Sequence, residues 1–237
     1  GEFSSIIGLI KRAQRIYGRI FTVSGVVVAF NKAALHDIGY WTSDNVTEDI
    51  DVSWRLQLNH WDVRFEPNAL CWILTPETLL GLARQRIRWA QGGAETFLRY
   101  VGKMLPWRCR RMWLICIEYI VSVVWSYALV LTIVLWALGK FIVLPPTLRI
   151  ESLTPEWTGV ILGLTCLLQS GVSLVLDSRY EKGLVRYFFW MVWYPLAYWI
   201  INVVATVQGF PKALLKKTGE RAVWISPDRG IQSLPKD

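Results

Sequence analysis

The sequence predicts an α/β segment that is followed by interfacial helices and then by membrane-spanning α-helices. Of the 237 residues, 53% are hydrophobic, and the mean hydropathy is +0.33. This apolar share exceeds the 45–50% typical of soluble domains. The chain also has 14 Trp residues, and Trp favours the membrane–water interface. The apolar residues gather in the second half, whereas residues 1–111 have a mixed composition.

Candidate strands and helices alternate in the first half of the chain. Residues 21–30 (FTVSGVVVAF) are apolar and β-branched, which predicts a buried strand with a close backbone approach at Ser24 and Gly25. Two further strands are expected around a turn at Pro67 and Asn68. The alternation indicates half of an α/β domain. The expected helices cover residues 3–17, a short stretch that begins at 31–35 and stops near Gly39, and residues 48–59. The two further strands cover residues 61–66 and 69–74.

Amphipathic helices are expected next. Thr75, Pro76 and Glu77 have the composition of a helix start, with a capping hydroxyl, a proline and an acid in succession. The predicted helix ends at a break at Gly92 and Gly93, and a second amphipathic piece covers residues 94–104.

Three long apolar stretches follow, at residues 113–138, 157–176 and 184–210. Each is long enough to cross a hydrocarbon core of about 30 Å. Buried core helices are the alternative, which the sequence disfavours. Pro195 is expected to kink the third stretch.

Loop charge predicts the orientation of these stretches, because Lys and Arg are retained on the cytoplasmic side. Basic residues precede the first stretch, so this side is expected to be cytoplasmic. Three plain crossings would export the tail, yet the tail is basic, so we expect the third stretch to fail as a simple crossing and the tail to be cytoplasmic. The basic residues are Arg99, Lys103, Arg108, Arg110 and Arg111 before the first stretch, and Lys212, Lys216, Lys217, Arg221, Arg229 and Lys236 in the tail.

The formal charge of +8 indicates anionic lipid as a partner. Nucleic acid is the weaker alternative and is not expected as a partner, because no basic helix with interleaved aromatic residues stands outside the apolar half. The four cysteines have no CxxC spacing, and neither histidine lies near them. Neither a disulfide framework nor a zinc site is therefore expected.

The first chemical motif is Thr47-Glu48-Asp49, at the start of a predicted helix. Backbone N–H groups and the helix dipole should keep a carboxylate there ionised, as a general base requires. A plain acidic helix start is the alternative. Glu48 and Asp49 are adjacent, so they cannot straddle a glycosidic bond as the two carboxyls of a hydrolase do. Asp49 and Asp51 diverge on a helix, which argues against a metal-binding DxD.

The second motif is Gln85-Arg86-Ile87-Arg88-Trp89, in which Gln85, Arg88 and Trp89 share one helix face. A guanidinium on that face can clamp a diphosphate, and Trp89 offers an apolar platform for a sugar ring. A lipid-bound amphipathic helix is the alternative.

The two motifs together, followed by long apolar stretches, resemble the processive family-2 glycosyltransferases, which include cellulose, hyaluronan and chitin synthases. Nearly the whole chain takes part in this resemblance. Several local stretches are most similar to the bacterial members that build a biofilm polysaccharide of β-linked N-acetylglucosamine. These stretches are TVSG at 22–25, TEDIDVSWRLQL at 47–58, EPNALCWILTPETL at 66–79, QRIRWAQGGAE at 85–95 and WISPDRG at 224–230.

The resemblance implies a role for each motif residue. Asp49 would be the general base, and Glu48 would shape its pocket. Gln85 and Arg88 would bind the donor diphosphate. Three residues would bind the acceptor sugar, namely Trp89, Ser24 and Gly25.

The resemblance also implies an organisation and a set of partners. Residues 1–75 would be the second half of a GT-A type transferase domain, residues 76–111 interfacial helices, residues 112–210 the transmembrane region and residues 211–237 a basic tail. The partners would be a UDP-sugar, the growing polysaccharide, the bilayer of the bacterial inner membrane and a small accessory membrane subunit. The catalytic part would be cytoplasmic. A divalent metal, Mg or Mn, would be held by a missing amino-terminal half, and the fragment alone would be inactive.

Three other functions remain open from the residues alone. A chitin-, hyaluronan- or cellulose-type synthase would carry the same motifs. A non-processive transferase acting on a lipid would share them. A membrane transporter subunit would explain the apolar stretches and Glu118 within the first of them, but has no use for the two motifs.

Overall fold

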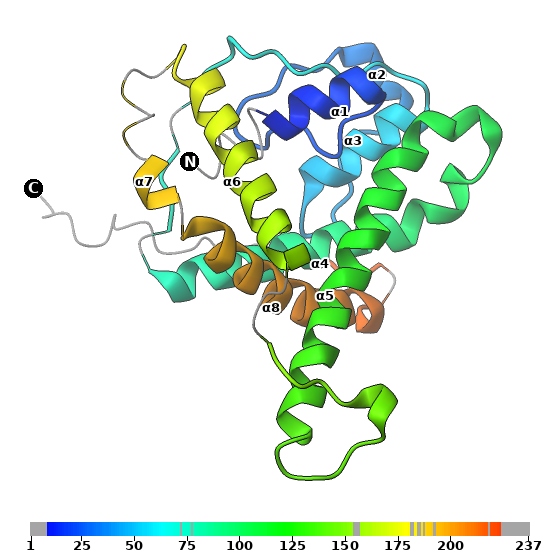
Figure 1. Cartoon of the computed structure of the whole chain (residues 1–237). Coiled ribbons are helices and arrows are strands. Elements are labelled where there is room, and N and C mark those ends of the chain that lie inside the picture. The colour runs from blue at the N-terminus through cyan, green and yellow to red at the C-terminus, as the bar shows by residue number, and fades with distance from the viewer. Residues whose placement is uncertain are drawn as a thin grey trace, which may run out of the picture. The chain divides into compact units, whose positions relative to one another are not determined.

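The computed structural model describes residues 9–71, 73–76, 78–153, 157–180, 183, 186, 188–191, 193–217 and 219–223. Within these ranges the chain forms helices joined by irregular segments, and none of the described residues is in a strand (Figure 1). The predicted tail beyond residue 223, including WISPDRG, lies outside the described residues.

The chain divides into two compact units, which we describe separately. One comprises residues 11–119 and 204–237, and the other comprises residues 1–10 and 120–203. The first unit contains both chemical motifs, and we call it the motif unit. The second is the apolar unit. The helices α5 (Trp113–Leu138) and α8 (Tyr194–Leu215) each contribute residues to both.

The motif unit is built around α3 (Glu48–Leu58) and α4 (Leu79–Met104), which pack against each other. Their core combines Trp54 of α3 with Tyr100 and Met104 of α4, all at most 5% exposed. Ile115, from the first turn of α5, completes this cluster. Among the described residues, this unit also contains the helices α1 (Lys11–Tyr17) and α2 (Lys32–Asp37) and the 3₁₀ helix η2 (Trp107–Met112).

The prediction of a buried strand at residues 21–30 is wrong for the described chain. Val26, Val27 and Val28 are 60%, 38% and 43% exposed, and the backbone there is irregular. A strand requires a backbone partner for its N–H and C=O groups, and the described residues supply none. The backbone groups of Ile20, Phe21 and Val23 bond instead to side chains of α3.

The strands predicted at residues 61–66 and 69–74 are likewise not observed in the described residues of those ranges. The turn between them is confirmed at Pro67 and Asn68, where the N–H of Ala69 donates to the carbonyl of Glu66. Together these corrections leave the α/β class untested, because the helices and the turn are present without the sheet.

The helix α4 differs from its prediction at two places, namely at its first residue and at Gly92 and Gly93. It begins at Leu79, because the Thr78 hydroxyl, and not Thr75, accepts from the first turn, at 3.0 Å from Gly81 N. It also runs without a break through Gly92 and Gly93 to Met104. These glycines allow close packing, as described below, and do not end the helix.

Two helical segments are long and apolar enough to cross a membrane among the described residues. They are Trp107–Leu138, which includes α5, and Gly159–Asp177, within α6 (Trp157–Asp177). The first two apolar stretches of the sequence are therefore confirmed as helices of spanning length. Between them lies a short 3₁₀ helix, η3 (Pro146–Leu148).

The described residues of the third apolar stretch include two helices, α7 (Phe188–Met191) and α8, and neither is among the spanning candidates. The predicted kink at Pro195 is wrong. Pro195 lies in the first turn of α8, where no N–H donor is needed, and α8 continues past residue 210 to Leu215.

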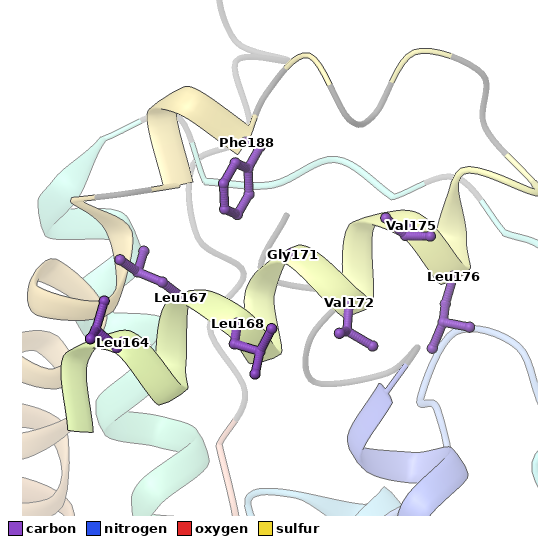
Figure 2. Close-up of a pocket in the computed structure, with 8 residues that line it drawn as sticks. All are labelled: Leu164, Leu167, Leu168, Gly171, Val172, Val175, Leu176 and Phe188. Carbon is purple, nitrogen blue, oxygen red and sulfur yellow. The ribbon is translucent and has the colours of Figure 1, made fainter. Parts of the chain in front are cut away.

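In the apolar unit, an open groove of about 560 Å³ runs along α6. Figure 2 shows Phe188 of α7 above Gly171 of α6, and a Cβ at Gly171 would lie 3.2 Å from the Phe188 ring. The lining is entirely apolar: Leu164, Leu167, Leu168, Gly171, Val172, Val175, Leu176 and Phe188.

In the motif unit, α8 crosses α4 at Gly209. A Cβ placed at Gly209 would lie 2.7 Å from Gln91 N and 2.9 Å from Ile87 O. Both are backbone atoms of α4, so they cannot move aside as a side chain would. Glycine at this position therefore permits the close crossing.

We expect Gly209→Ala to destabilise the protein. Alanine normally favours a helix interior by up to about 1 kcal/mol, but overpacking against backbone costs about 1–3 kcal/mol. Thermal unfolding of the purified full-length protein in detergent measures the difference. Gly163→Ala in α6 is the control, because nothing lies within 4 Å of its Cβ position. Equal midpoints for the two variants would contradict the crossing.

Candidate active site

Asp49 lies in the first turn of α3, and the segment that carries Ser24 and Gly25 lies against it. A Cβ at Gly25 would be 3.3 Å from Asp49 Oδ2. The expected close approach at this glycine is thus observed, although the strand is not. A side chain at position 25 would crowd the carboxylate, so glycine keeps one side of Asp49 open.

Side chains of α3 hold this segment in place. The Gln57 amide accepts from Ile20 N at 2.9 Å and donates to Ile20 O at 2.8 Å. Trp54 Nε1 donates to Phe21 O at 2.9 Å. Ser53 Oγ accepts from Val23 N at 2.8 Å. These residues follow one another at helical spacing toward Asp49, so they align the segment along the helix.

A side chain outside α3, that of Gln14, also holds this segment in place. Gln14 of α1 accepts from Phe21 N at 3.0 Å, and its amide donates to Glu118 of α5 at 3.1 Å. Glu118 therefore has a hydrogen-bond partner within the motif unit.

The electrostatics of Asp49 differ from the expectation based on its position in the helix. Burial, followed by the negative charge of Glu48, raises the pKa of the Asp49 carboxyl above its usual value. The N–H of Ile50, which donates to Asp49 Oδ1 at 2.9 Å, and the positive charge of Lys11 act in the opposite direction. The expected lowering by the helix start is thus outweighed. The carboxylate is a stronger base than a free aspartate.

Asp51 has a structural role. It is 1% exposed and accepts from Tyr100 Oη, Arg55 Nε and Thr42 Oγ1 at 2.8, 2.8 and 3.2 Å. Burial and the Asp51 charge raise the pKa of the Tyr100 hydroxyl, which keeps it protonated as a donor.

No group of three or more His, Cys, Asp or Glu side chains able to bind a metal occurs among the described residues.

The loop before Asp49 is bonded to α4, the helix that carries the second motif. Arg88 Nη1 donates to Val46 O at 3.2 Å, and Val46 N donates to Glu95 Oε2 at 3.4 Å. Asn45 Nδ2 donates to Thr96 Oγ1 at 2.9 Å. The two motifs are therefore held together by polar contacts along one face of α4.

At the centre of this contact, Thr47 packs onto Gly92. A Cβ at Gly92 would overlap with Thr47 Oγ1 and would lie 2.7 Å from Thr47 Cβ. Only glycine fits here, because the loop approaches the helix backbone directly. The contact with Thr47 explains why position 92, where the sequence predicted a helix break, is a glycine.

Within the second motif, Trp89 is half-buried, and the guanidinium of Arg86 lies 4.2 Å from its ring centroid. This cation–π contact occupies one face of the indole. Gln85 makes no hydrogen bond to a described residue and is half-buried beside them. The structure thus joins Arg88 to the loop before Glu48, whereas no direct contact places Trp89 or Gln85 against Asp49.

Sequence reasoning missed three residues of the site. Arg86 could have been found from its spacing of three residues to Trp89. Glu95 is 7% exposed and binds Gln91 and Lys216, at 2.8 and 2.9 Å, but no pattern in the sequence marks it. Lys11 is 7% exposed although it lies in a basic run that predicts a solvated face.

Comparisons with known proteins identify the family of the chain. The sequence profile of the Glycosyl transferase family group 2 matches residues 2–202. The chain belongs to this family. Membership decides against the transporter subunit and confirms the resemblance drawn from the two motifs.

Curated members of the family include poly-β-1,6-N-acetyl-D-glucosamine synthases. The chain is 41% identical over 229 residues to the protein of that name from Staphylococcus epidermidis, and 42% identical over 229 residues to that from Staphylococcus aureus strain COL. In both cases the match covers 97% of this chain and 56% of the relative. The chain thus spans a little over half the length of these relatives. No solved structure matches.

We expect Gly92→Ala to reduce transferase activity by roughly 10- to 100-fold, because a shift of about 1 Å in a catalytic group costs that much. Rotating Thr47 cannot relieve the clash, since its Cβ is among the close atoms. UDP release by the full-length protein in membranes measures the effect. Gly102→Ala, also in α4 with nothing within 4 Å, is the matched control. An active Gly92→Ala enzyme would show that the loop does not need this contact.

Proposed function

We propose that the full-length protein polymerises β-linked N-acetylglucosamine from UDP-GlcNAc and moves the product across the membrane as a biofilm exopolysaccharide. One observation carries the proposal: Asp49 lies beside Gly25, and Arg88 of the second motif holds the loop that comes directly before the first turn of α3. The identity to N-acetylglucosamine polymer synthases supports the choice of sugar.

In the proposed reaction, the acceptor hydroxyl attacks the anomeric carbon of the donor as Asp49 accepts its proton. Attack from the face opposite the leaving UDP inverts the α-linked donor to a β-linked product. The leaving diphosphate takes the electron pair of the broken C–O bond. The raised pKa of Asp49 suits this transfer, because a stronger base accepts the proton more readily.

The other motif residues are assigned to binding. Gln85 and Arg88 would hold the diphosphate. A guanidinium carries five N–H donors, so Arg88 can serve the Val46 carbonyl and an anion together. Trp89 would stack on the acceptor sugar with the face that Arg86 does not cover. Ser24 and Gly25 would line the acceptor site, and Glu48 would shape its edge.

We further propose that residues 1–75 belong to a GT-A type domain completed by a longer chain. Family membership is consistent with that fold, and the exposed Val26–Val28 side chains are of the type that pack in a sheet. The completing part would hold the divalent metal, Mg or Mn, that family members typically use. Residues 76–111 would lie at the interface, and residues 112–210 would form the membrane region.

The protein would act in the bacterial inner membrane with its catalytic part in the cytoplasm. The lipid bilayer, the UDP-sugar and the growing polysaccharide are its proposed partners, together with a small accessory membrane subunit. The tail would be cytoplasmic as well. This placement is supported because Lys216 bonds to Glu95, and Ala222 N donates to Ser43 O, both within the motif unit. Two crossings return the chain to its starting side, in agreement with the basic tail.

Asp49→Asn in the full-length protein should abolish polymer synthesis, because the amide cannot accept the acceptor proton. UDP release with UDP-GlcNAc, UDP-Glc and UDP-GlcA as donors measures both the loss and the sugar preference. Donor affinity should stay close to wild type. The control is Asp62→Asn, because Asp62 is largely exposed and forms surface ion pairs only.

The base assignment fails if Asp49→Asn keeps more than about a tenth of wild-type turnover, since loss of a general base costs about 10²–10⁴-fold. Incorporation of glucose alone would instead favour a cellulose-type synthase, and incorporation of glucuronate together with N-acetylglucosamine would favour a hyaluronan-type synthase. A 1,4-linked N-acetylglucosamine product would indicate a chitin-type synthase.

The tail placement can be tested by cysteine labelling. In a background without the native cysteines, Val223→Cys should resist an impermeant maleimide in intact cells, whereas Ser152→Cys, between the two spanning helices, should react. Val223 is 74% exposed and Ser152 is exposed too, so burial would not protect either. Labelling at both positions would place the tail outside and require a third crossing.

A further inference from the structure

Residues 43–46, the loop directly before the first turn of α3, form neither helix nor strand. The backbone polar groups of such a loop need partners from elsewhere in the fold. Two α4 side chains, Arg88 and Glu95, bind the backbone of Val46. Further partners come from the segment that follows α8, which we call the strap and define as the described residues of 216–223.

The strap reaches this loop at two points. Lys216 Nζ donates to the carbonyl of Asp44, and Ala222 N donates to the carbonyl of Ser43 at 2.9 Å. The strap begins where α8 ends, and α8 itself lies against the backbone of α4 at Gly209. Two successive carbonyls of the loop are therefore bound by a segment that is distant in sequence.

Lys216 also forms an ion pair with Glu95 of α4. Its Nζ lies 2.9 Å from Glu95 Oε2, and the two side chains are 14% and 5% exposed. The same carboxylate oxygen accepts from Val46 N at 3.4 Å, and Gln91 Nε2 donates to the other oxygen at 2.8 Å. One buried carboxylate thus joins α4, the loop and the strap.

The enclosure of Lys216 distinguishes it from the rest of the basic tail. A lysine that only added charge to the tail would extend into water, and Lys217 beside it is exposed. Enclosing an ammonium costs free energy unless it is paired and hydrogen-bonded. The loop and α4 supply both the hydrogen bond and the opposite charge. The ammonium therefore has a specific contact with the loop that leads into Asp49.

We propose that Lys216 is a positioning residue for the transfer reaction, which fixes the loop before α3 and thereby the place of Asp49. It acts through its ion pair with Glu95 and its hydrogen bond to Asp44 O. The inference rests on the proposed function, because that function assigns Asp49 as the base. Lys216 touches no reacting atom. A residue beyond the third apolar stretch thereby helps to build the site.

Two measurements on the full-length protein test this role with Lys216→Met. Hydrogen exchange of the detergent-purified protein should show protection in residues 42–47 reduced by about tenfold or more, because exchange reports local opening. UDP release in membranes at saturating UDP-GlcNAc, per folded enzyme, should fall by roughly 5- to 50-fold, since a small displacement of a catalytic group costs that much. The loss should be partial, because Arg99 still binds the Asp44 carboxylate at 2.8 Å.

The KM for UDP-GlcNAc should stay close to wild type, because a misplaced base affects the transfer step and not donor binding. Lys216→Arg can make the same two contacts and should retain most of the exchange protection and of the rate. Lys217→Met is the matched control, because it removes an exposed charge at the next position. It should behave as wild type in both measurements.

A double variant separates positioning from stability. Lys216→Met alone leaves the Glu95 carboxylate buried without its counter-charge, which destabilises the fold. Adding Glu95→Gln removes that charge, so the thermal unfolding midpoint should recover. The rate should stay low, because Asp44 O still lacks the ammonium. If Lys216→Met does not accumulate, the double variant takes its place in both measurements.

Three outcomes would overturn the proposal. A wild-type rate per folded enzyme, with a loop that has lost its protection, would show that the contact is structural only. A lowered rate with unchanged exchange in residues 42–47 would show that Lys216 does not act through the loop. A raised KM with an unchanged maximal rate would assign Lys216 to donor binding.

The outcome also separates this inference from the proposed function, because hydrogen exchange depends on neither the donor nor the base. If Asp49→Asn is inactive and Lys216→Met has the wild-type rate, only the role of Lys216 fails. If Asp49→Asn is active, the base assignment fails, and the inference with it. Should the wild type turn over another UDP-sugar, the same comparison is made with that donor.

Discussion

Thr47 packs directly onto the backbone of α4 at Gly92, and the rest of the motif unit depends on this approach. Because no side chain separates the loop from the helix, Val46 comes within reach of both Arg88 and Glu95. The first turn of α3 is thereby fixed relative to the second motif. Glu95 in turn binds Lys216, from the segment after α8, so the same helix face also fixes the end of the third apolar stretch.

Much of the helical structure could be predicted from the sequence, because local patterns determine it. The length and hydropathy of residues 113–138 and 157–176 sufficed for α5 and α6, and the helix beginning at Glu48 was expected at its observed start. The approach of Gly25 to Asp49 was also anticipated, since a glycine within an apolar, β-branched run often marks a close contact. These features depend on neighbours in sequence or on a single residue type.

The strands and the charge balance could not be predicted in this way, because they depend on partners that are distant in sequence. Residues 21–30 have the composition of a strand, but in the described chain the backbone groups of Phe21 and Val23 bond to side chains of α3. Gly92 resembled a helix break, because the sequence does not reveal the loop that packs on it. The pKa of Asp49 was expected to fall at a helix start, but burial and Glu48 dominate.

The two charges that act on Asp49 differ in their exposure to solvent, and this has a consequence for ionic strength. Glu48 is exposed, so its field passes partly through water and weakens as dissolved salt accumulates, whereas the enclosed Lys11 is screened much less. Salt therefore removes the repulsion and leaves the attraction. At high ionic strength Asp49 would therefore stay ionised at a lower pH than in dilute buffer.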